Sequence, residues 1–94
     1  MKTYSQIEAS EKLNALSLKD WKFDTNSLQR QFIFKDFREA MNFMMKAGDI
    51  AEELNHHPDW SNVYNRVNVH LSTHDAGGVT DKDFELAKRM NSIG

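Results

Sequence analysis

The sequence predicts an α+β fold of two layers, with a four-stranded antiparallel sheet and three helices on one face, in the order α-β-β-α-β-β-α. Capping-box spacings open a helical pattern near each end of the chain, and residues 36–55 form a third, longer helical pattern. Residues 21–34 and 62–73 instead alternate apolar and polar side chains, as half-buried strands do. The 94 residues have room for one small domain, which we expect to span residues 1–94.

The first helix is expected to begin at Ser5, whose spacing to Glu8 fits a capping box. Its apolar positions are Ile7, Leu13 and Leu16. A hairpin is expected over residues 21–34, with its turn at "DTNS". Its apolar side chains are Trp21 and Phe23 on the first strand and Leu28, Phe32 and Phe34 on the second.

Residues 36–55 predict the longest helix, which Asp36 can cap and which contains no proline. When its residues are placed about 100° apart around the axis, the apolar side chains cover an arc of about 220°, whereas a surface helix needs about 100°. The arc consists of Phe37, Ala40, Met41, Phe43, Met44, Met45, Ala47, Ile50, Ala51 and Leu54. One part can pack on the sheet, and the remainder favours contact with a partner subunit. The alternative is an exposed surface rich in methionine.

Residues 62–73 predict a strand, or two strands with a bulge or tight bend near Asn65–Asn68. By alternation, one face carries Val63, Val67, Val69 and Leu71, and the other carries Tyr64, Arg66, His70 and Ser72. After a glycine loop, Thr80 and Asp83 open the last helix with a capping-box spacing. Its inward side chains are expected to be Phe84, Leu86, Ala87, Met90 and Ile93.

The composition argues against several classes of function. The formal net charge is −2 and no block of like charge stands out, so nothing indicates nucleic acid or an anionic membrane as a partner. The chain has no cysteine, which excludes thiol nucleophiles, disulfides and thiolate metal sites. The first ten residues contain no apolar signal-peptide core, and no apolar run has the length of a membrane span. A cytoplasmic or nuclear setting is therefore expected.

The segment "EELNHHPDW", residues 52–60, carries the candidate chemistry. Its adjacent histidines, His56 and His57, are of the residue type that titrates nearest neutrality. Pro58, the only proline of the chain, stiffens their loop. A stiff loop can hold an acid or a base in one orientation. The alternative is a pair of ordinary solvated loop residues.

Three further residues are candidates for the same site, each with a simpler alternative role. Glu52 lies within the apolar arc, where a carboxylate needs a partner or a task, unless it reaches solvent from the helix end. His74 ends a strand beside a glycine loop, which suits a pocket residue or an ordinary surface residue. Asp83 has a strong alternative role as a helix cap. Zinc could in principle be bound by His56, His57, His74 and Glu52, but no metal-binding histidine spacing exists, so no metal is expected.

Together these residues resemble the signature of the pterin-4a-carbinolamine dehydratases, a family also known as the dimerisation cofactor of a homeodomain transcription factor. The resemblance rests on Glu52, His56, His57, Pro58, Tyr64, His74 and Asp83. Its surroundings agree too, through "FKDF", "HHPDWSNVYNRV" and "LSTHDAGGVTDKDFELA". It extends over residues 21–87.

The resemblance implies a hydro-lyase that removes water from 4a-hydroxytetrahydrobiopterin, or a related pterin, to give the quinonoid dihydropterin. This reaction regenerates the tetrahydrobiopterin cofactor of aromatic amino acid hydroxylases and requires no metal or redox cofactor. The implied catalytic residues are His57, as the lead acid or base, and His56 and His74 beside the pterin ring.

The resemblance also implies supporting residues and partners. Glu52 would orient or polarise a histidine, Asp83 would complete the site, and the loop would be shaped by Pro58 and Trp60. The implied assembly is a homodimer that extends the sheet, or a homotetramer built through the 36–55 helix. The competing hypothesis is a non-catalytic module that binds a pterin or stabilises dimers of a transcription factor.

Overall fold

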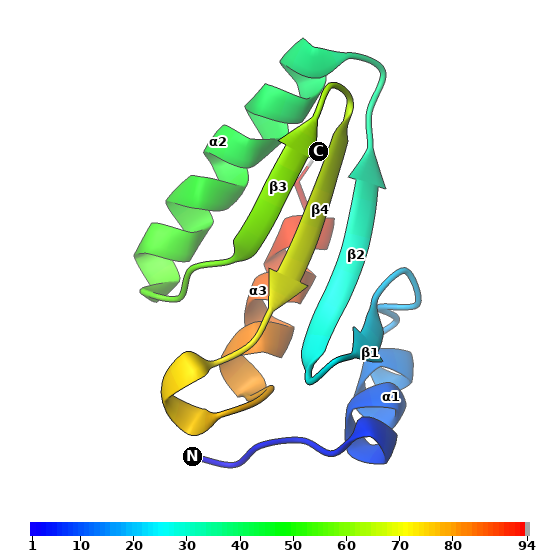
Figure 1. The fold of residues 1–94 in the computed structure, drawn as a ribbon, viewed down its shortest axis with the longest axis vertical. Helices are drawn as coiled ribbons and strands as arrows, with labels where there is room; N and C mark the ends of the chain where they lie inside the picture. The colour runs from blue at the N-terminus through cyan, green and yellow to red at the C-terminus, as the bar shows by residue number, and fades with distance from the viewer. Residues whose placement is uncertain (94) are drawn as a thin grey trace.

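The computed structural model describes residues 1–93, and its elements follow the predicted order (Figure 1). The helices are α1 (Gln6–Ala15), α2 (Phe37–Leu54), the short 3-10 helix η1 (His74–Ala76) and α3 (Asp81–Asn91). The strands are β1 (Lys22–Asp24), β2 (Ser27–Ile33), β3 (Asp59–Val63) and β4 (Arg66–Leu71). All neighbouring strands pair antiparallel, in the order β1-β2-β4-β3. The predicted α+β fold is confirmed.

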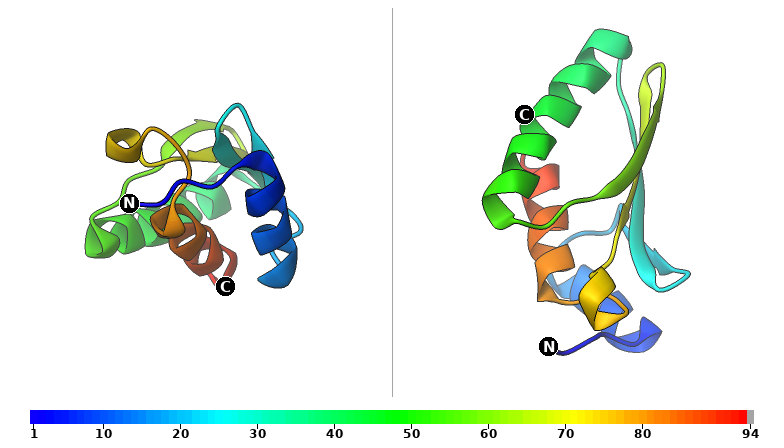
Figure 2. Two further views of the ribbon diagram at one scale, coloured as in Figure 1. Left: turned by 90° about the horizontal axis from the view of Figure 1, so that it is seen from below. Right: turned by 60° about the vertical axis from the view of Figure 1, so that its left-hand side comes forward.

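The sheet forms one layer and the helices form the other. In the left view of Figure 2, α1, α2 and α3 all lie on the same side of the sheet. Their shared core contains alternate residues of β4 and the inner faces of α2 and α3, namely Val67, Val69, Leu71, Ala40, Phe43, Ala47, Ala51, Phe84, Leu86, Ala87 and Met90. None of the helices within residues 1–93 is both long enough and apolar enough to cross a membrane.

The helix starts form as the sequence predicts. Glu8 N–H donates to Ser5 Oγ at 3.2 Å, and Ser5 N–H donates to Glu8 Oε1 at 3.0 Å, which completes the first capping box. Asp36 caps α2 by accepting from Glu39 N–H at 2.9 Å. Asn55 follows the last residue of α2 as its C-cap, and its φ of 50° lies in the left-handed region that asparagine tolerates. This turn leads the chain directly into the histidine loop.

The predicted apolar stripe of α1 is only partly right. Leu13 is buried, but Ile7 is 75% exposed and Leu16 lies beyond the helix end. Ala9 is fully buried instead. The helix packs beside β1, at the edge of the sheet, so a narrow buried stripe suffices.

The predicted orientation of Val63 is wrong. A turn at residues 64–65 separates β3 from β4 and pairs Val63 with Arg66 across the ladder. Directly paired residues share a face, so Val63 points outward with Arg66 and is 67% exposed, whereas Val67 is buried. The bend begins one residue before the predicted range, with Tyr64 at a φ of 50°.

The N-terminal residues are tied to the start of α3. Tyr4 N–H donates to Val79 O at 2.9 Å, and the Tyr4 hydroxyl donates to Asp81 Oδ1 at 2.5 Å. Lys12 Nζ donates to the Tyr4 hydroxyl and to Asp81 Oδ1, each at 2.9 Å. The hydrogen bond from Tyr4, followed by that from Lys12, holds the pKa of Asp81 below its usual value.

Replacing Tyr4 with phenylalanine should lower the free energy of unfolding at pH 7 by about 0.5 to 1 kcal/mol, because the donor to Asp81 is lost. A carboxyl whose folded pKa is lowered contributes stability above its unfolded pKa, and the contribution disappears as the pH falls through the folded pKa. The difference from the wild type should therefore shrink below the ordinary aspartate pKa of 3.8. Urea unfolding across this range measures it, with Tyr64→Phe as the exposed control. A difference independent of pH would contradict the assignment.

Candidate active site

Two parts of the chain that are distant in sequence meet at the lower left of Figure 1: residues 55–58 after α2, and the η1 turn with the start of α3. A cavity of about 280 Å³ lies between them. Its lining includes His56, His57, His74, Ser72, Thr73 and Lys82. The fold therefore brings the three histidines singled out in the sequence to one cavity.

Asp83 fixes the orientation of His56. The Asp83 side chain is fully buried, and its Oδ1 lies 2.5 Å from His56 Nε2, which is itself largely buried. An ionised carboxylate only accepts hydrogen bonds, so this contact places a hydrogen on His56 Nε2. His56 Nδ1 is then the ring nitrogen left to meet a ligand.

Two threonines complete the environment of this carboxylate. Asp83 Oδ2 accepts from Thr73 Oγ1 and from Thr80 N–H, each at 2.9 Å. The single hydroxyl hydrogen of Thr73 is used in this way, so Thr80 must donate in the 2.7 Å contact between the two hydroxyls. Lys82 N–H in turn donates to Thr80 Oγ1 at 3.3 Å. Asp83 thus caps α3 and contacts His56 at the same time.

Glu52 pairs with the second histidine of the loop. Its Oε1 lies 2.5 Å from His57 Nε2, and both side chains are more than half exposed. The simpler expectation, that Glu52 reaches solvent from the helix end, is therefore also met. An exposed pair contributes little to stability, but it favours one ring orientation with the hydrogen on Nε2 and Nδ1 facing away from Glu52.

The remaining predicted site residues occupy different positions. His74 is the first residue of η1, because β4 already ends at Leu71, and its side chain is exposed. Pro58 precedes β3 and is half-buried. Trp60 belongs to β3, pairs with Val69 and packs against the core, so neither Pro58 nor Trp60 lines the cavity. Within residues 1–93, no group of three or more acidic or histidine side chains is arranged to hold a metal ion.

Comparison with known proteins covers nearly the whole chain. The family model described as "Pterin 4 alpha carbinolamine dehydratase" matches residues 2–93. A relative from Sulfurisphaera tokodaii is 46% identical over 93 residues, covering 99% of this chain and 98% of its own. One from Opitutus terrae is 56% identical over 77 residues, covering 81% and 79%. Both are named "Putative pterin-4-alpha-carbinolamine dehydratase".

A solved structure extends the similarity to three dimensions. The crystal structure of a transcriptional coactivator/pterin dehydratase from Brucella melitensis superposes with a TM-score of 0.89 at 42% identity and covers 97% of both chains. The resemblance found in the sequence is confirmed by these matches. The chain belongs to the pterin-4a-carbinolamine dehydratase family of hydro-lyases.

Proposed function

We propose that this protein dehydrates a 4a-hydroxytetrahydropterin, such as 4a-hydroxytetrahydrobiopterin, to the quinonoid dihydropterin during recycling of the tetrahydropterin cofactor. Family membership supports the reaction class. The observation that carries the proposal is the convergence of three histidines on one cavity, two of them paired with carboxylates.

The reaction requires two proton movements and no electron transfer to a cofactor. The bond between C4a and the hydroxyl oxygen breaks, and the leaving oxygen takes up a proton to become water. N5 loses its proton, and the double bond between C4a and N5 forms. Imidazole groups titrate near neutrality and can both donate and accept protons, so histidines suit each movement.

The three histidines differ in how they can take part. His57 is the lead acid or base, because it is exposed at the cavity and Glu52 occupies only its Nε2. His56 is held by Asp83 and mostly buried, which suits it to orient the pterin ring. His74 lines the same cavity from the η1 turn and assists protonation of the leaving oxygen.

The direct test is a rapid assay with freshly generated 4a-hydroxytetrahydrobiopterin. The wild-type protein should accelerate the loss of substrate absorbance in proportion to its concentration. Treatment with a chelator should leave the rate unchanged, because no proton movement above uses a metal. A rate equal to that of buffer alone would overturn the proposal and favour the non-catalytic binding module.

The proposed assembly rests on the apolar side chains that α2 leaves exposed along one flank. Met45 is 71% exposed and Phe37 is 48% exposed on this helix, while Met41 and Met44 are half-buried. Exposed apolar side chains on one helix face favour a second copy of the same surface. The proposed oligomer is a homodimer or homotetramer through α2, with the sheet edge as a further contact.

Replacing Met45 with glutamate should weaken this self-association, because it places a charge in the apolar contact. Sedimentation equilibrium of the wild type and the variant measures the change in dissociation constant, which we expect to rise by about ten-fold or more. Ile7→Glu is the matched control, since Ile7 is a similarly exposed apolar residue on α1. Equal association of all three proteins would argue against the α2 interface.

A further inference from the structure

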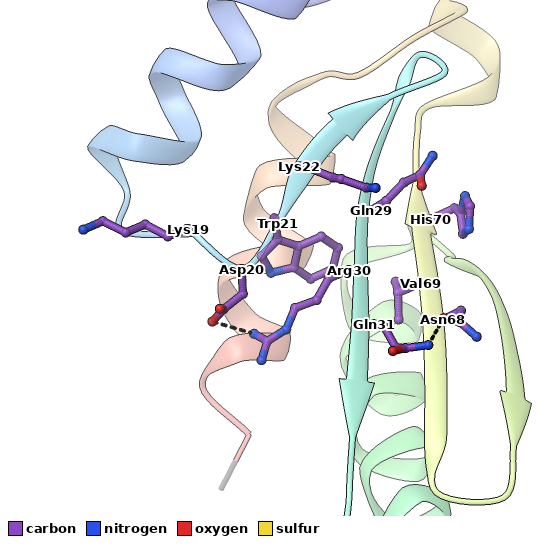
Figure 3. Close-up of a pocket in the computed structure, with 10 residues that line it drawn as sticks. All are labelled: Lys19, Asp20, Trp21, Lys22, Gln29, Arg30, Gln31, Asn68, Val69 and His70. Atoms are coloured by element: carbon purple, nitrogen blue, oxygen red, sulfur yellow. Dashed lines mark hydrogen bonds and ion pairs between the residues drawn. The ribbon is translucent and has the colours of Figure 1, made fainter.

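The cavity of about 360 Å³ drawn in Figure 3 does not direct its polar side chains at a common point. Lys22 and Gln31 lie on the outer face of the sheet, whereas the guanidinium of Arg30 packs on the helix-covered face against an aromatic ring of β2. Polar side chains do converge around the buried Asp83. This carboxylate reaches the catalytic cavity, of about 280 Å³, through its contact with His56.

Thr73 is the residue that ties the η1 turn to α3. Its N–H donates to Gly78 O at 2.8 Å and its O accepts from Gly77 N–H at 3.0 Å, which closes the turn that begins with His74. Its hydroxyl donates to Asp83 Oδ2 at 2.9 Å. Thr73 lines the catalytic cavity but is only 6% exposed. One buried residue therefore connects the turn that carries His74 with the carboxylate of Asp83.

The groups on either side of the Thr73 hydroxyl fix the direction of its hydrogen bonds. The Asp83 carboxylate has no hydrogen to give, so Thr73 must donate to it. The Thr80 hydroxyl, which belongs to a fully buried residue, then donates to Thr73 at 2.7 Å. Hydrogen bonds in a chain polarise one another, so a hydroxyl that accepts a hydrogen bond is a stronger donor. Thr73 thus presents a strengthened donor to Asp83.

This donor restrains the Asp83 carboxylate. Among residues 1–93, the only side chains that bond Asp83 are those of His56 and Thr73, because the contact from Thr80 comes from its backbone N–H. The terminal torsion of an aspartate has a broad energy well and is easily turned. With Oδ2 held by Thr73, Oδ1 stays directed at His56 Nε2, so the ring keeps its orientation.

We propose that Thr73 is a positioning residue of the dehydratase site, a role that rests on the proposed function. Its hydroxyl holds Asp83, which keeps the hydrogen of His56 on Nε2 and leaves Nδ1 open to the pterin. Its backbone keeps the η1 turn, and with it His74, beside the same cavity. Thr73 acts through these side chains and requires no contact with the reacting atoms.

The test begins with Thr73→Val, which keeps the shape of the side chain and removes its hydroxyl. The backbone of Thr73 is extended, at φ −106° and ψ 101°, and suits a β-branched residue. We expect kcat for a 4a-hydroxytetrahydropterin to fall about ten-fold, as for other residues that orient a catalytic group. In ¹H–¹⁵N NMR without substrate, His56 Nε2–H should exchange with water about ten-fold faster or more. Thr73→Ser returns the hydroxyl and should restore both values to near those of the wild type.

The matched control is Ser27→Ala, which removes another buried hydroxyl. Ser27 is 8% exposed, lies outside the catalytic cavity and donates through Oγ to Asp24 O at 3.0 Å. This variant should lower the midpoint of urea unfolding but leave kcat and the His56 signal unchanged. Three results would each overturn the role of Thr73: an unchanged His56 signal in Thr73→Val, an equal change in Ser27→Ala, or no recovery in Thr73→Ser.

A measurement on the wild type covers the case in which Thr73→Val does not fold. The Thr73 hydroxyl proton should appear as a slowly exchanging NMR signal, because it is buried and bonded to Asp83, and its absence would overturn the proposal. Neither NMR readout requires catalysis. A wild type that shows both signals but lacks dehydratase activity would overturn the proposed function alone. An active wild type whose His56 signal is insensitive to Thr73→Val would overturn the role of Thr73 alone.

Discussion

The His57→Ala variant should lose about 10²- to 10⁴-fold in kcat for a 4a-hydroxytetrahydropterin, the usual contribution of a positioned general acid or base. Its fold should be unaffected, because the His57 side chain is 55% exposed and its hydrogen bond to Glu52 is at the surface. Surface substitutions of this kind change the free energy of unfolding by about 0.5 kcal/mol or less. A large loss of rate with unchanged stability would therefore reflect chemistry rather than folding.

Two further variants sharpen this test. Glu52→Gln keeps an oxygen that can accept from His57 Nε2–H but removes the negative charge, so we expect a smaller loss of about ten-fold in kcat. His70→Ala removes an exposed histidine of β4 that lies outside the catalytic cavity and should leave the rate unchanged. Rapid assays of the three variants beside the wild type give the comparison. If His57→Ala and His70→Ala had the same small effect, His57 would not be the lead acid or base.

Much of the fold was predictable because its signals are local. Capping boxes at Ser5 and Thr80, and the cap at Asp36, involve residues three positions apart, so the sequence displays them directly. The orientation of Val63 was not predictable in this way. It depends on the exact position of a two-residue turn, and moving that turn by one residue transfers a side chain to the opposite face.

The residues of the candidate site also differ in whether a local sequence signal reveals them. The histidine pair and its proline were visible as a rare local cluster, and its place within the apolar arc of the helix singled out Glu52. Thr73 carried no such signal, because a threonine hydroxyl is common and its contact with Asp83 exists only after the loop folds back on α3.

Asp83→Asn should reverse the hydrogen-bond polarity around His56. All three partners of the Asp83 carboxylate, namely His56 Nε2–H, the Thr73 hydroxyl and Thr80 N–H, donate to it. An asparagine replaces one accepting oxygen with a donating amide. If that amide faces the threonines, the Thr73 hydroxyl and Thr80 N–H, which both donate, meet a group that also donates. The less costly solution directs it toward His56, which must then accept at Nε2 and carry its hydrogen on Nδ1.

The expected result is a moderate loss of stability with a larger loss of activity. Stability should fall by about 1 to 3 kcal/mol, because one buried charged acceptor is removed, and kcat should fall by about 10²-fold or more, because the ring presents the wrong tautomer. Urea unfolding and the rapid assay measure the two effects. Asp81→Asn, in the same helical turn but without contact to His56, is the control. The ¹⁵N shifts of the His56 ring would distinguish a tautomer change from a merely loosened helix start, since only the former moves the hydrogen from Nε2 to Nδ1.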